Sequence, residues 1–405
     1  MECGLLGRKL GHSYSPQIHA LLGAYSYRLL ELEPEAVGPF LKAGAFTGLN
    51  VTIPYKKAVI PYLDALSPEA KRLGAVNTIL RREGKLIGHN TDYFGFRYLV
   101  EKSGLQVAGK KALVLGSGGA SNTASAVLEE LGARVVVISR TGENNYQNLS
   151  RHADAAVIVN ATPVGMYPNT GVRPLDLGQF PGLEGVLDAI YNPARTQILL
   201  DAERRGLTAV NGLWMLVAQA KESAQWFTGK PISDDVIAPI HRALRQQMEN
   251  ILLVGMPGCG KTTVGQQLAQ ELGKKFVDAD QALEETTGRK ITDILPSQGE
   301  AAFRALETQT LADLGKQSGL VIATGGGCVT REENYDLLHQ NGTVFWLTRE
   351  LNKLPTQGRP LSRDLGQMYA RREPMYRRFA DAAVSNDGSV EQTVREIQRI
   401  WEENL

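Results

Sequence analysis

The sequence predicts an α/β protein of two or three domains built around parallel sheets. Short apolar runs of strand length recur along the 405 residues and are followed by helical patterns. Twice such a run leads straight into a glycine-rich loop and a helix, at residues 111–131 and 251–272. A chain of this length suits two or three domains of roughly 150 residues each. Each glycine loop is therefore expected to belong to an α/β unit of its own.

Charge and cysteine content exclude several classes of protein. The formal net charge is +1, which leaves no electrostatic footprint for nucleic acid or an anionic membrane. No apolar run approaches the roughly 20 residues of a membrane span, and no signal peptide is expected before the first strand. Cys3, Cys259 and Cys328 form neither a disulfide framework nor a metal-binding spacing. We expect a reduced, cytoplasmic chain with small-molecule substrates and no nucleic-acid or membrane partner; its oligomeric state stays open.

Residues 1–101 are predicted to form a domain whose polar side chains gather where strands end. Strands are expected at Glu2–Gly7 and Phe46–Ile53, and a helix between them has Leu21 on its apolar face. In open α/β sheets, ligands bind at the carboxyl ends of the strands. The side chains expected at that edge are Ser13, Ser15, Thr52, Lys56, Asn77 and Asp92.

This polar set suits a small polyhydroxylated acid. Serine hydroxyls can hold a carboxylate, amide and carboxylate oxygens can hold ring hydroxyls, and one ammonium group is present. Taken singly, Lys56 or Asp92 would more readily be a partner in a surface salt bridge. His12 is expected to belong to the loop structure rather than to act as a base.

Residues 102–212 are predicted to form a Rossmann domain. The strand Lys111–Leu115 ends in a glycine loop that opens a helix, and Arg134–Ile138 is the next strand. An acidic residue after that second strand would favour NAD, but here a guanidinium lies between two hydroxyls, which suits the 2′-phosphate of NADP(H). The alternative is an arginine that only covers the adenine face. The residues expected at the cofactor are Gly116, Gly118, Gly119, Ala120, Ser139, Arg140 and Thr141.

Residues 1 to about 240 resemble the shikimate dehydrogenases. The segments that carry the resemblance, in the order of the family, are His12–Pro16, Asn50–Lys56, Gly74–Thr78, Asn90–Asp92, the first glycine loop, Ser139–Thr141, Asn160–Thr162 and Asn211–Gln219. The resemblance implies reduction of 3-dehydroshikimate by NADPH, with the helices around 213–240 returning to the first domain. It further implies that the residues at the substrate are Ser13, Ser15, Thr52, Asn77, Tyr191 and Gln219. The additional residues implied at the cofactor are Asn160, Thr162, Gly212 and Met215.

The acid–base chemistry of such a reduction falls on Lys56 and Asp92. Hydride arriving at a ring ketone develops negative charge on the oxygen, which Lys56 can stabilise and protonate. Asp92 would orient Lys56 and a ring hydroxyl. Which of the two is the formal acid stays open.

The second glycine loop follows the apolar run Ile251–Val254 and has the pattern of a phosphate-binding loop. Backbone N–H groups can surround an anion there, at the positive end of a helix. Lys261 is expected to reach the β- and γ-phosphates of ATP, and the Thr262 hydroxyl to bind Mg²⁺. The alternative is a glycine-rich turn with a surface lysine. The residues expected at the nucleotide are Gly255, Gly258, Cys259, Gly260, Lys261, Thr262 and Thr263.

Four charged residues after this loop suit phosphoryl transfer, which needs a metal ion and a placed acceptor hydroxyl. Asp278 can bind Mg²⁺ through water, and Asp280 can accept the acceptor's proton. Arg304, on a helix that Gly299 is expected to open, and Arg372 can each hold a carboxylate bidentately. The alternatives are a helix cap for the aspartates and a solvated face for the arginines.

Residues 250–405, which follow a short linker at 241–249, resemble the shikimate kinases. The matching pieces are the glycine loop, Asp278–Asp280, Phe303–Arg304, Gly325–Gly327, Arg359–Leu361 and Arg372–Tyr376. The resemblance implies phosphorylation of the shikimate 3-hydroxyl by ATP with Mg²⁺, and it makes Arg359 the lid arginine on the phosphates. It places at shikimate the residues Asp280, Arg304, Gly326, Gly327 and Arg372.

The two resemblances together predict a bifunctional enzyme that carries out consecutive steps towards chorismate. One alternative is a ligand-sensing regulator derived from such domains, which would have no need of Lys56, Lys261 or Asp280. A narrower alternative is a dehydrogenase that prefers quinate or NAD.

Overall fold

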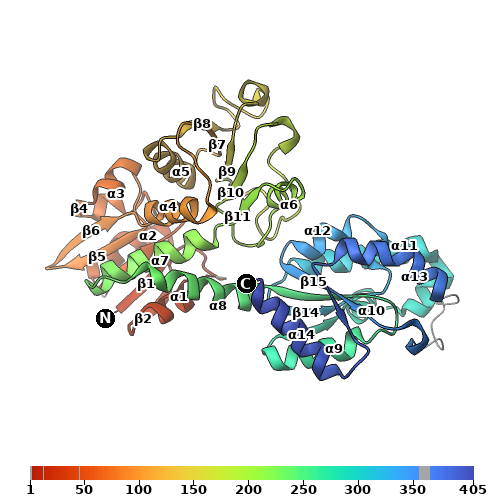
Figure 1. Ribbon diagram of the computed structural model, residues 1–405. Helices are drawn as coiled ribbons and strands as arrows, with labels where there is room; N and C mark the ends of the chain where they lie inside the picture. The colour runs from red at the N-terminus through yellow and green to blue at the C-terminus, as the bar shows by residue number, and fades with distance from the viewer. Residues whose placement is uncertain (1, 12, 45, 355–364) are drawn as a thin grey trace. The chain divides into compact units, whose positions relative to one another are not determined.

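The computed structural model of the chain describes residues 2–11, 13–44, 46–354 and 365–405. The chain divides into two compact units (Figure 1). Both units are α/β, as predicted. Within the described residues, no helix is both long enough and apolar enough to cross a membrane. The first unit comprises Met1–Val164, Arg173–Tyr191 and Asp201–Arg242; the second comprises Gly165–Val172, Asn192–Leu200 and Ala243–Leu405.

The first sheet of the first unit has six strands in the order β2-β1-β3-β5-β6-β4. β1 pairs in parallel with β2 and β3, whereas β5 runs antiparallel to β3 and β6. Leu6, Leu49 and Ile79 of this sheet pack with Leu41 in a core without exposed surface. The strands are β1 Glu2–Gly7, β2 Ser26–Glu31, β3 Gly48–Val51, β4 Ala65–Leu66, β5 Thr78–Arg82 and β6 Lys85–His89, and the helices are α1 Ser15–Leu22, α2 Pro34–Ala43, α3 Pro68–Leu73, α4 Asp92–Ser103 and α7 Leu213–Thr228.

The structure corrects the sequence prediction at two places in this region. Leu21 is 59% exposed, because α1 buries Ser15, Ile18 and His19, which lie at the i, i+3 and i+4 positions of one helix face. The predicted strand Phe46–Ile53 shortens to β3, so that Thr52 lies in the turn beyond the strand.

The second sheet of the first unit has five parallel strands in the order β11-β10-β9-β7-β8. β7 pairs with β8 so that Leu115 lies opposite Ile138. The glycine loop after β7 and the residues after β8 therefore leave the sheet at the same edge, as the Rossmann prediction requires. The elements are β7 Lys111–Leu115, α5 Gly119–Glu130, β8 Arg134–Ile138, β9 Val157–Asn160, β10 Gly185–Asp188 and β11 Thr208–Val210. Two further helices, α6 Gln197–Arg204 and α8 Ile237–Met248, each have residues in both units.

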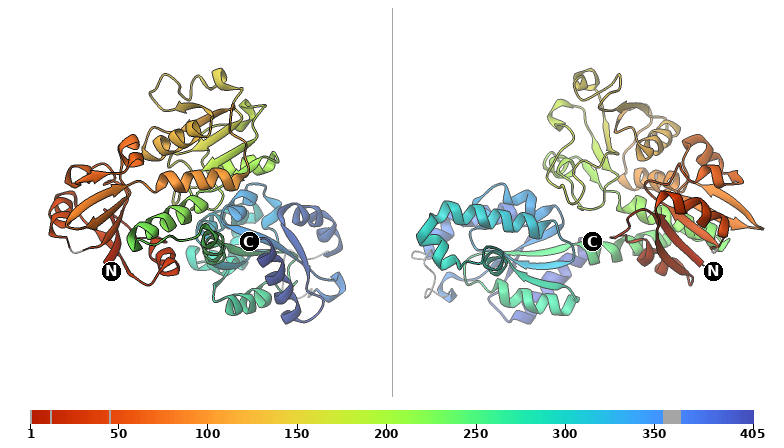
Figure 2. Two further views of the ribbon diagram at one scale, coloured as in Figure 1. Left: turned by 60° about the vertical axis from the view of Figure 1, so that its left-hand side comes forward. Right: turned by 180° about the vertical axis from the view of Figure 1, so that it is seen from behind.

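The sheet of the second unit also has five parallel strands, in the order β13-β14-β12-β15-β16. Helices α9 and α14 cover one face, and α11 and α12 cover the other (Figure 1); the reverse view in Figure 2 shows the same layers. The elements are β12 Asn250–Val254, α9 Lys261–Leu272, β13 Lys275–Asp278, α10 Ala279–Thr287, α11 Ile291–Gly315, β14 Leu320–Ala323, α12 Asn334–His339, β15 Gly342–Thr348, α13 Leu365–Phe379, β16 Ala382–Ser385 and α14 Val390–Glu403.

Gly299 separates two helical segments, and the second begins directly after it, as predicted. α11 begins at Ile291, and at Gly299 the backbone φ of +81° breaks the helical geometry. A residue with a side chain is strained at such a φ, so glycine suits the kink. The helix resumes beyond the kink and carries Arg304.

Candidate active sites

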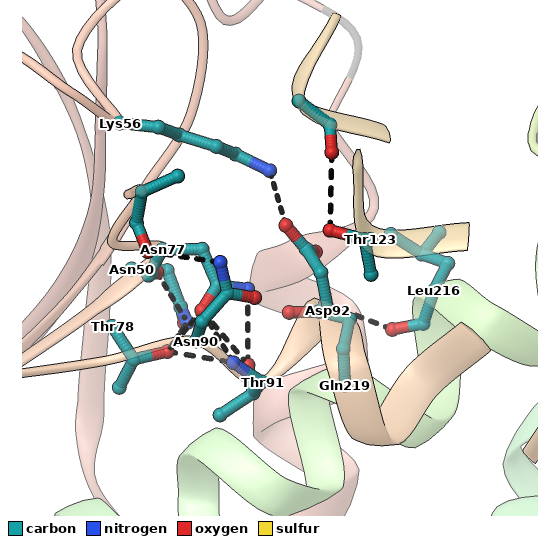
Figure 3. Close-up of polar contacts among 12 residues, drawn as sticks. Asn50, Lys56, Asn77, Thr78, Asn90, Thr91, Asp92, Thr123, Leu216 and Gln219 are labelled. Carbon is teal, nitrogen blue, oxygen red and sulfur yellow. Dashed lines mark hydrogen bonds and ion pairs between the residues drawn. The ribbon is translucent and has the colours of Figure 1, made fainter. Parts of the chain in front are cut away.

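The catalytic pair predicted in the first unit forms in the structure. Lys56 Nζ lies 2.5 Å from Asp92 Oδ2, and Figure 3 shows the two side chains pointing toward each other. Lys56 lies in the turn beyond β3, and Asp92 is the first residue of α4. Their side chains are 29% and 15% exposed, so water screens the pair less than an ordinary surface ion pair.

A buried hydrogen-bond network holds the residue before Asp92. The Thr91 backbone N–H donates to Asn77 Oδ1 at 2.7 Å, and Asn77 Nδ2 donates to Thr91 Oγ1 at 3.0 Å (Figure 3). Ser223 of α7 joins the network at 2.9 Å from Thr91 Oγ1, and Asn50 Nδ2 donates to Ser223 Oγ at 2.8 Å. These bonds occupy the Asn77 carbonyl oxygen and one of its amide hydrogens.

The serine loop and Tyr191 lie together, as the sequence predicted for a substrate site. The Ser15 backbone N–H donates to Ser13 Oγ at 3.2 Å, which fixes the loop before α1. Tyr14 packs edge-to-face on Tyr191, with ring centroids 6.2 Å apart. Burial raises the pKa of Tyr191, so this phenol stays a neutral donor. His12, also predicted in this loop, lies outside the described residues.

Helix α7 brings Gln219 against α4 through a close approach at Gly95. A Cβ on Gly95 would lie 2.7 Å from Met215 O and 2.9 Å from Gln219 Cβ. Gln219 Nε2 donates to Leu216 O at 2.9 Å, which orients its amide beside the start of α4 (Figure 3). The turn before α7 is equally tight, because the backbone of Gly212 packs directly on Ala189.

The predicted cofactor loop has the open glycine surface that a dinucleotide needs. No atom lies within 4 Å of a Cβ built on Gly118 or Gly119, and α5 begins at Gly119. Ser121 Oγ donates to Gly116 O at 2.7 Å and so closes the turn beneath this surface. The exposed N–H groups at the start of a helix suit a pyrophosphate. Ala120, in the first turn of α5, is exposed as well.

The residues after β8 fit the predicted contact with a 2′-phosphate. Ser139 Oγ accepts the Gly142 N–H at 2.9 Å and shapes the turn that presents Arg140 and Thr141. Both side chains are exposed at the same sheet edge as the glycine loop. An exposed guanidinium at this place is a suitable partner for a phosphate dianion.

Asn160 stabilises this edge of the sheet, because both the nitrogen and the oxygen of its side-chain amide form hydrogen bonds within the protein. Its amide donates to Asp188 at 3.1 Å and to Val164 O at 3.3 Å. Its carbonyl accepts the backbone N–H and the hydroxyl of Thr162. Asn160 and Asp188 are fully buried. The hydrogen bond from Asn160 to Asp188 was not predicted from the sequence, because Asp188 belongs to no glycine or hydroxyl motif.

In the second unit, the phosphate loop curls around the ammonium group of Lys261. Lys261 Nζ donates to Gly255 O at 2.9 Å and to Met256 O at 3.1 Å. Gly258 and Gly260 take φ values of +82° and +101°, which side chains rarely adopt, so the loop needs glycine there. Thr263 is exposed in the first turn of α9.

The donor set beside this loop fits Mg²⁺. Thr262 Oγ1 donates to Asp278 Oδ2 at 2.9 Å, which brings two oxygen ligands together. Asp278 Oδ1 also accepts the Asp280 N–H at 3.1 Å and caps α10. One carboxylate oxygen of Asp278 therefore caps α10, while the other contacts Thr262 of the phosphate loop. A role as helix cap is thus compatible with a role as Mg²⁺ ligand.

A cavity of about 570 Å³ adjoins the phosphate loop and has the charges predicted for an acidic substrate. Arg304 Nη1 donates to Glu307 Oε2 at 2.8 Å, and the guanidinium lies against Gly327. Arg372 Nη1 donates to Gly326 O at 3.0 Å. Burial raises the pKa of Asp280, a carboxyl group that lines the same cavity as these arginines and the phosphate loop. The cavity size is typical of a small-molecule site.

Two charged residues of this cavity were not predicted, and one predicted residue cannot be placed. Glu307 is a buried partner of Arg304; its i+3 position on the same helix was the signal that could have found it. Arg349 lines the same cavity. Arg359, the predicted lid arginine, lies outside the described residues.

The cysteines next to the glycine turns are buried small residues. Cys259 and Cys328 have no exposed surface. Burial raises the pKa of the Cys328 thiol to about 12, so it remains protonated. Both are small residues packed beside tight glycine turns, and neither is an exposed reactive thiol.

Comparisons with known proteins match both parts of the chain. The family model for the shikimate dehydrogenase substrate binding domain matches residues 5–79, and that for shikimate kinase matches residues 257–402. The NADP(+) shikimate dehydrogenase of Symbiobacterium thermophilum is 38% identical over 269 residues, which are 58% of this chain and 91% of that protein.

Solved structures agree with the match to the first part. Shikimate dehydrogenase 1 from Peptoclostridium difficile is 38% identical with a TM-score of 0.56, over 60% of this chain and 98% of that one. A shikimate 5-dehydrogenase from Thermus thermophilus, in complex with NADP(H) and shikimate, is 34% identical with a TM-score of 0.56, over 60% of this chain and 99% of that one.

The fold and the two sites define a pyridine-nucleotide dehydrogenase joined to a phosphate-loop kinase. The chain belongs to the shikimate dehydrogenase family, and residues 257–402 add a shikimate kinase domain. The predicted fusion of these two enzymes in one chain is thereby confirmed.

Proposed function

We propose that the first unit reduces 3-dehydroshikimate to shikimate with NADPH, and that the second unit phosphorylates the 3-hydroxyl of shikimate with ATP and Mg²⁺. The observation that carries this proposal is that each unit has the ionisable groups of one complete reaction. Lys56 and Asp92 form a pair in the first unit, and Asp280 lines one cavity with two arginines and the phosphate loop in the second. A regulator that only senses a ligand would need neither set.

The dehydrogenase residues hold the substrate and move one proton. NADPH, when bound, supplies the hydride that adds to the carbonyl carbon of 3-dehydroshikimate. The electron pair of the C=O bond moves to the oxygen, where the Lys56 ammonium stabilises the charge and delivers a proton. Asp92 accepts a hydrogen bond from Lys56 and keeps Nζ aimed at that oxygen. Ser13 and Ser15 hold the carboxylate of the acid.

The kinase residues place the acceptor and neutralise charge. ATP with Mg²⁺ supplies the γ-phosphoryl group that the substrate oxygen attacks. Asp280 accepts the proton of the 3-hydroxyl. Arg304 and Arg372 hold the carboxylate, and Glu307 keeps the Arg304 guanidinium in place. Lys261 stabilises the negative charge that develops between the β- and γ-phosphates.

The residues of the two units support Mg²⁺ and NADP(H) as the metal ion and the dinucleotide. Thr262 and Asp278 hold Mg²⁺, and the glycine surface at Gly118 and Gly119 receives the pyrophosphate of NADP(H). Arg140 pairs with the 2′-phosphate, which favours NADP(H) over NAD. We also propose a cytoplasmic location, which the unpaired thiols of all three cysteines support.

A coupled assay tests the proposal. The purified chain is mixed with 3-dehydroshikimate, NADPH and Mg-ATP; loss of NADPH absorbance and formation of a phosphorylated product by mass spectrometry are followed together. Both signals are expected, and product formation should require all three reagents. A parallel reaction with quinate and NAD⁺ should be much slower. Ligand binding without turnover of either reaction would instead identify a regulator.

A further inference from the structure

Arg349 is a basic side chain at the phosphate loop for which no role has been assigned above. It directly follows β15, which pairs in parallel with β12 so that Trp346 lies opposite Val254. The chain after β12 is the phosphate loop itself. Arg349 and that loop therefore leave the sheet at the same edge, and both line the 570 Å³ cavity.

The backbone at Arg349 is tied to the phosphate loop by one buried asparagine. The Asn386 backbone N–H donates to Thr348 O at 2.9 Å, directly before Arg349. The Asn386 side-chain amide donates to Cys259 O at 2.7 Å, inside the loop. Gly255 also packs against the backbone of Leu347. Arg349 is thus held in a defined place relative to the groups that surround the phosphates.

The Arg349 guanidinium has a charge that the described part of the chain does not neutralise. Its Nε is buried and has no hydrogen-bond partner among the described residues. The other two arginines of the cavity differ, because Arg304 pairs with Glu307 and Arg372 donates to Gly326 O. A partly buried cation without a partner is costly in free energy, and an anion bound beside it would remove that cost.

The position of Arg349 indicates which anion it meets. Its Nη1 lies 3.9 Å from the Cβ position of Gly260, at the start of α9. The acceptor carboxylate is assigned instead to Arg304 and Arg372, around the glycine turn that follows β14. The anion at the start of α9 is the polyphosphate of the nucleotide.

We propose that Arg349 binds the phosphates of the nucleotide in the kinase reaction, as a second cation beside Lys261. A planar guanidinium can give two parallel hydrogen bonds to phosphate oxygens, which an ammonium group cannot. The proposal rests on the kinase function above and adds a nucleotide-binding residue to it.

The test compares Arg349→Ala with the wild-type chain. The KM for Mg-ATP and the dissociation constant of ADP are expected to rise about 10- to 100-fold, as for the loss of hydrogen bonds to a charged group. The KM for shikimate and the dehydrogenase rate should not change. Arg349→Lys should fall between the two proteins. Arg331→Ala is the matched control, because Arg331 pairs with Glu333 at 2.9 Å and does not line the cavity.

Binding of adenosine separates contact with the phosphates from contact with the base. Adenosine should bind Arg349→Ala and wild-type protein equally; a loss of adenosine affinity equal to that of ADP would overturn the phosphate contact. A change only in the KM for shikimate, or unchanged nucleotide binding in a folded variant, would also overturn it. If Arg349→Ala does not fold, Arg349→Gln keeps most of the volume and is measured in the same way. Absence of ATP binding by the wild-type chain would refute the kinase function itself.

Discussion

Two adjacent lysines in the first unit have different surroundings. Lys56 forms the partly buried ion pair with Asp92, whereas the side chain of Lys57 is exposed. We predict that Lys56→Ala lowers kcat for 3-dehydroshikimate by about 10²- to 10⁴-fold, because the proton donor and the positive charge are lost together. NADPH oxidation at saturating substrate measures this, and NADPH binding should stay near wild type.

Lys57→Ala is the matched control for that experiment. It removes the same charge one residue away and should keep the wild-type rate. An equal decrease of kcat in both variants would mean that Lys56 contributes only a positive charge to the loop and does not donate the proton.

Arg140 offers a prediction about cofactor choice. Arg140→Ala should weaken NADPH binding by about 10- to 100-fold, since a hydrogen bond to a charged group is worth ~1.5–3 kcal/mol, and should leave NADH binding almost unchanged. Fluorescence titration with both cofactors gives the ratio. Arg134→Ala, at the other end of β8, should not change that ratio. A similar loss for both cofactors would assign Arg140 to the adenine instead.

The pH dependence of the kinase follows from the burial of Asp280. Burial raises the pKa of this carboxyl group above the ordinary range of aspartate. Because a base must be ionised to accept a proton, activity should fall as the pH drops through this raised pKa, and the fall should begin at a higher pH than for an exposed aspartate. The acid limb of kcat/KM for shikimate reports it. The same limb in Asp280→Asn would show that another group titrates.

The sequence predicted the residues that belong to motifs and missed those that meet by folding alone. Lys56, Asp92 and Lys261 lie in short segments with a recognisable order, and the structure pairs Lys56 with Asp92 as expected. Ser223 and Asp188 gave no such signal, because their partners Asn50 and Asn160 lie far away along the chain.

At the scale of elements, α4 and α7 of the first unit cross closely at Gly95. We predict that Gly95→Ala lowers the free energy of unfolding by about 1–3 kcal/mol, because the added Cβ overlaps Met215 O and Gln219 Cβ. Replacing glycine by alanine inside a helix normally stabilises it, so the sign itself is informative. Dehydrogenase activity should fall as well, since α4 begins at Asp92. Thermal unfolding and NADPH oxidation measure the two effects.

Gly182→Ala serves as the control for this crossing, because no atom lies within 4 Å of its Cβ position. It should leave both the melting temperature and the rate unchanged. A Gly95→Ala protein that is as stable as wild type would show that the two helices can separate at little cost.

The presence of strands was more predictable than their ends or the buried faces of helices. The parallel strands follow from apolar runs between glycine turns, and these were found. Leu21 was predicted on the wrong face of α1. A helix of eight residues has too few apolar residues to define which of its faces is buried. Gly299 was predicted to open a helix, and a helical segment does begin directly after it; the segment from Ile291 that precedes it was not predicted.

At the scale of the whole molecule, each set of proposed catalytic residues lies within a single unit. We therefore predict that Lys261→Ala abolishes phosphorylation and leaves the reduction of 3-dehydroshikimate unchanged, so that shikimate accumulates. Asp92→Asn should do the reverse. Separate assays of the two reactions in both variants measure this. Loss of both activities in either variant would show that the units depend on each other.

The passage of shikimate between the two reactions can be measured on the same chain. With independent sites, shikimate released by the first reaction mixes with the solution before the second. Labelled 3-dehydroshikimate supplied with an excess of unlabelled shikimate should then yield phosphorylated product with strongly diluted label. Product that keeps nearly all of its label would demonstrate direct transfer.

The burial of Cys3, Cys259 and Cys328 has a practical consequence for spectroscopy. These are all the cysteines of the chain, and each is shielded from solvent. The native protein should therefore take up almost no maleimide dye, and a cysteine introduced at exposed Lys57 of the first unit or at exposed Lys275 of the second would be its only reactive thiol. Each unit could carry one fluorophore in this way without removal of any natural cysteine, and energy transfer between the two dyes would measure their separation during turnover.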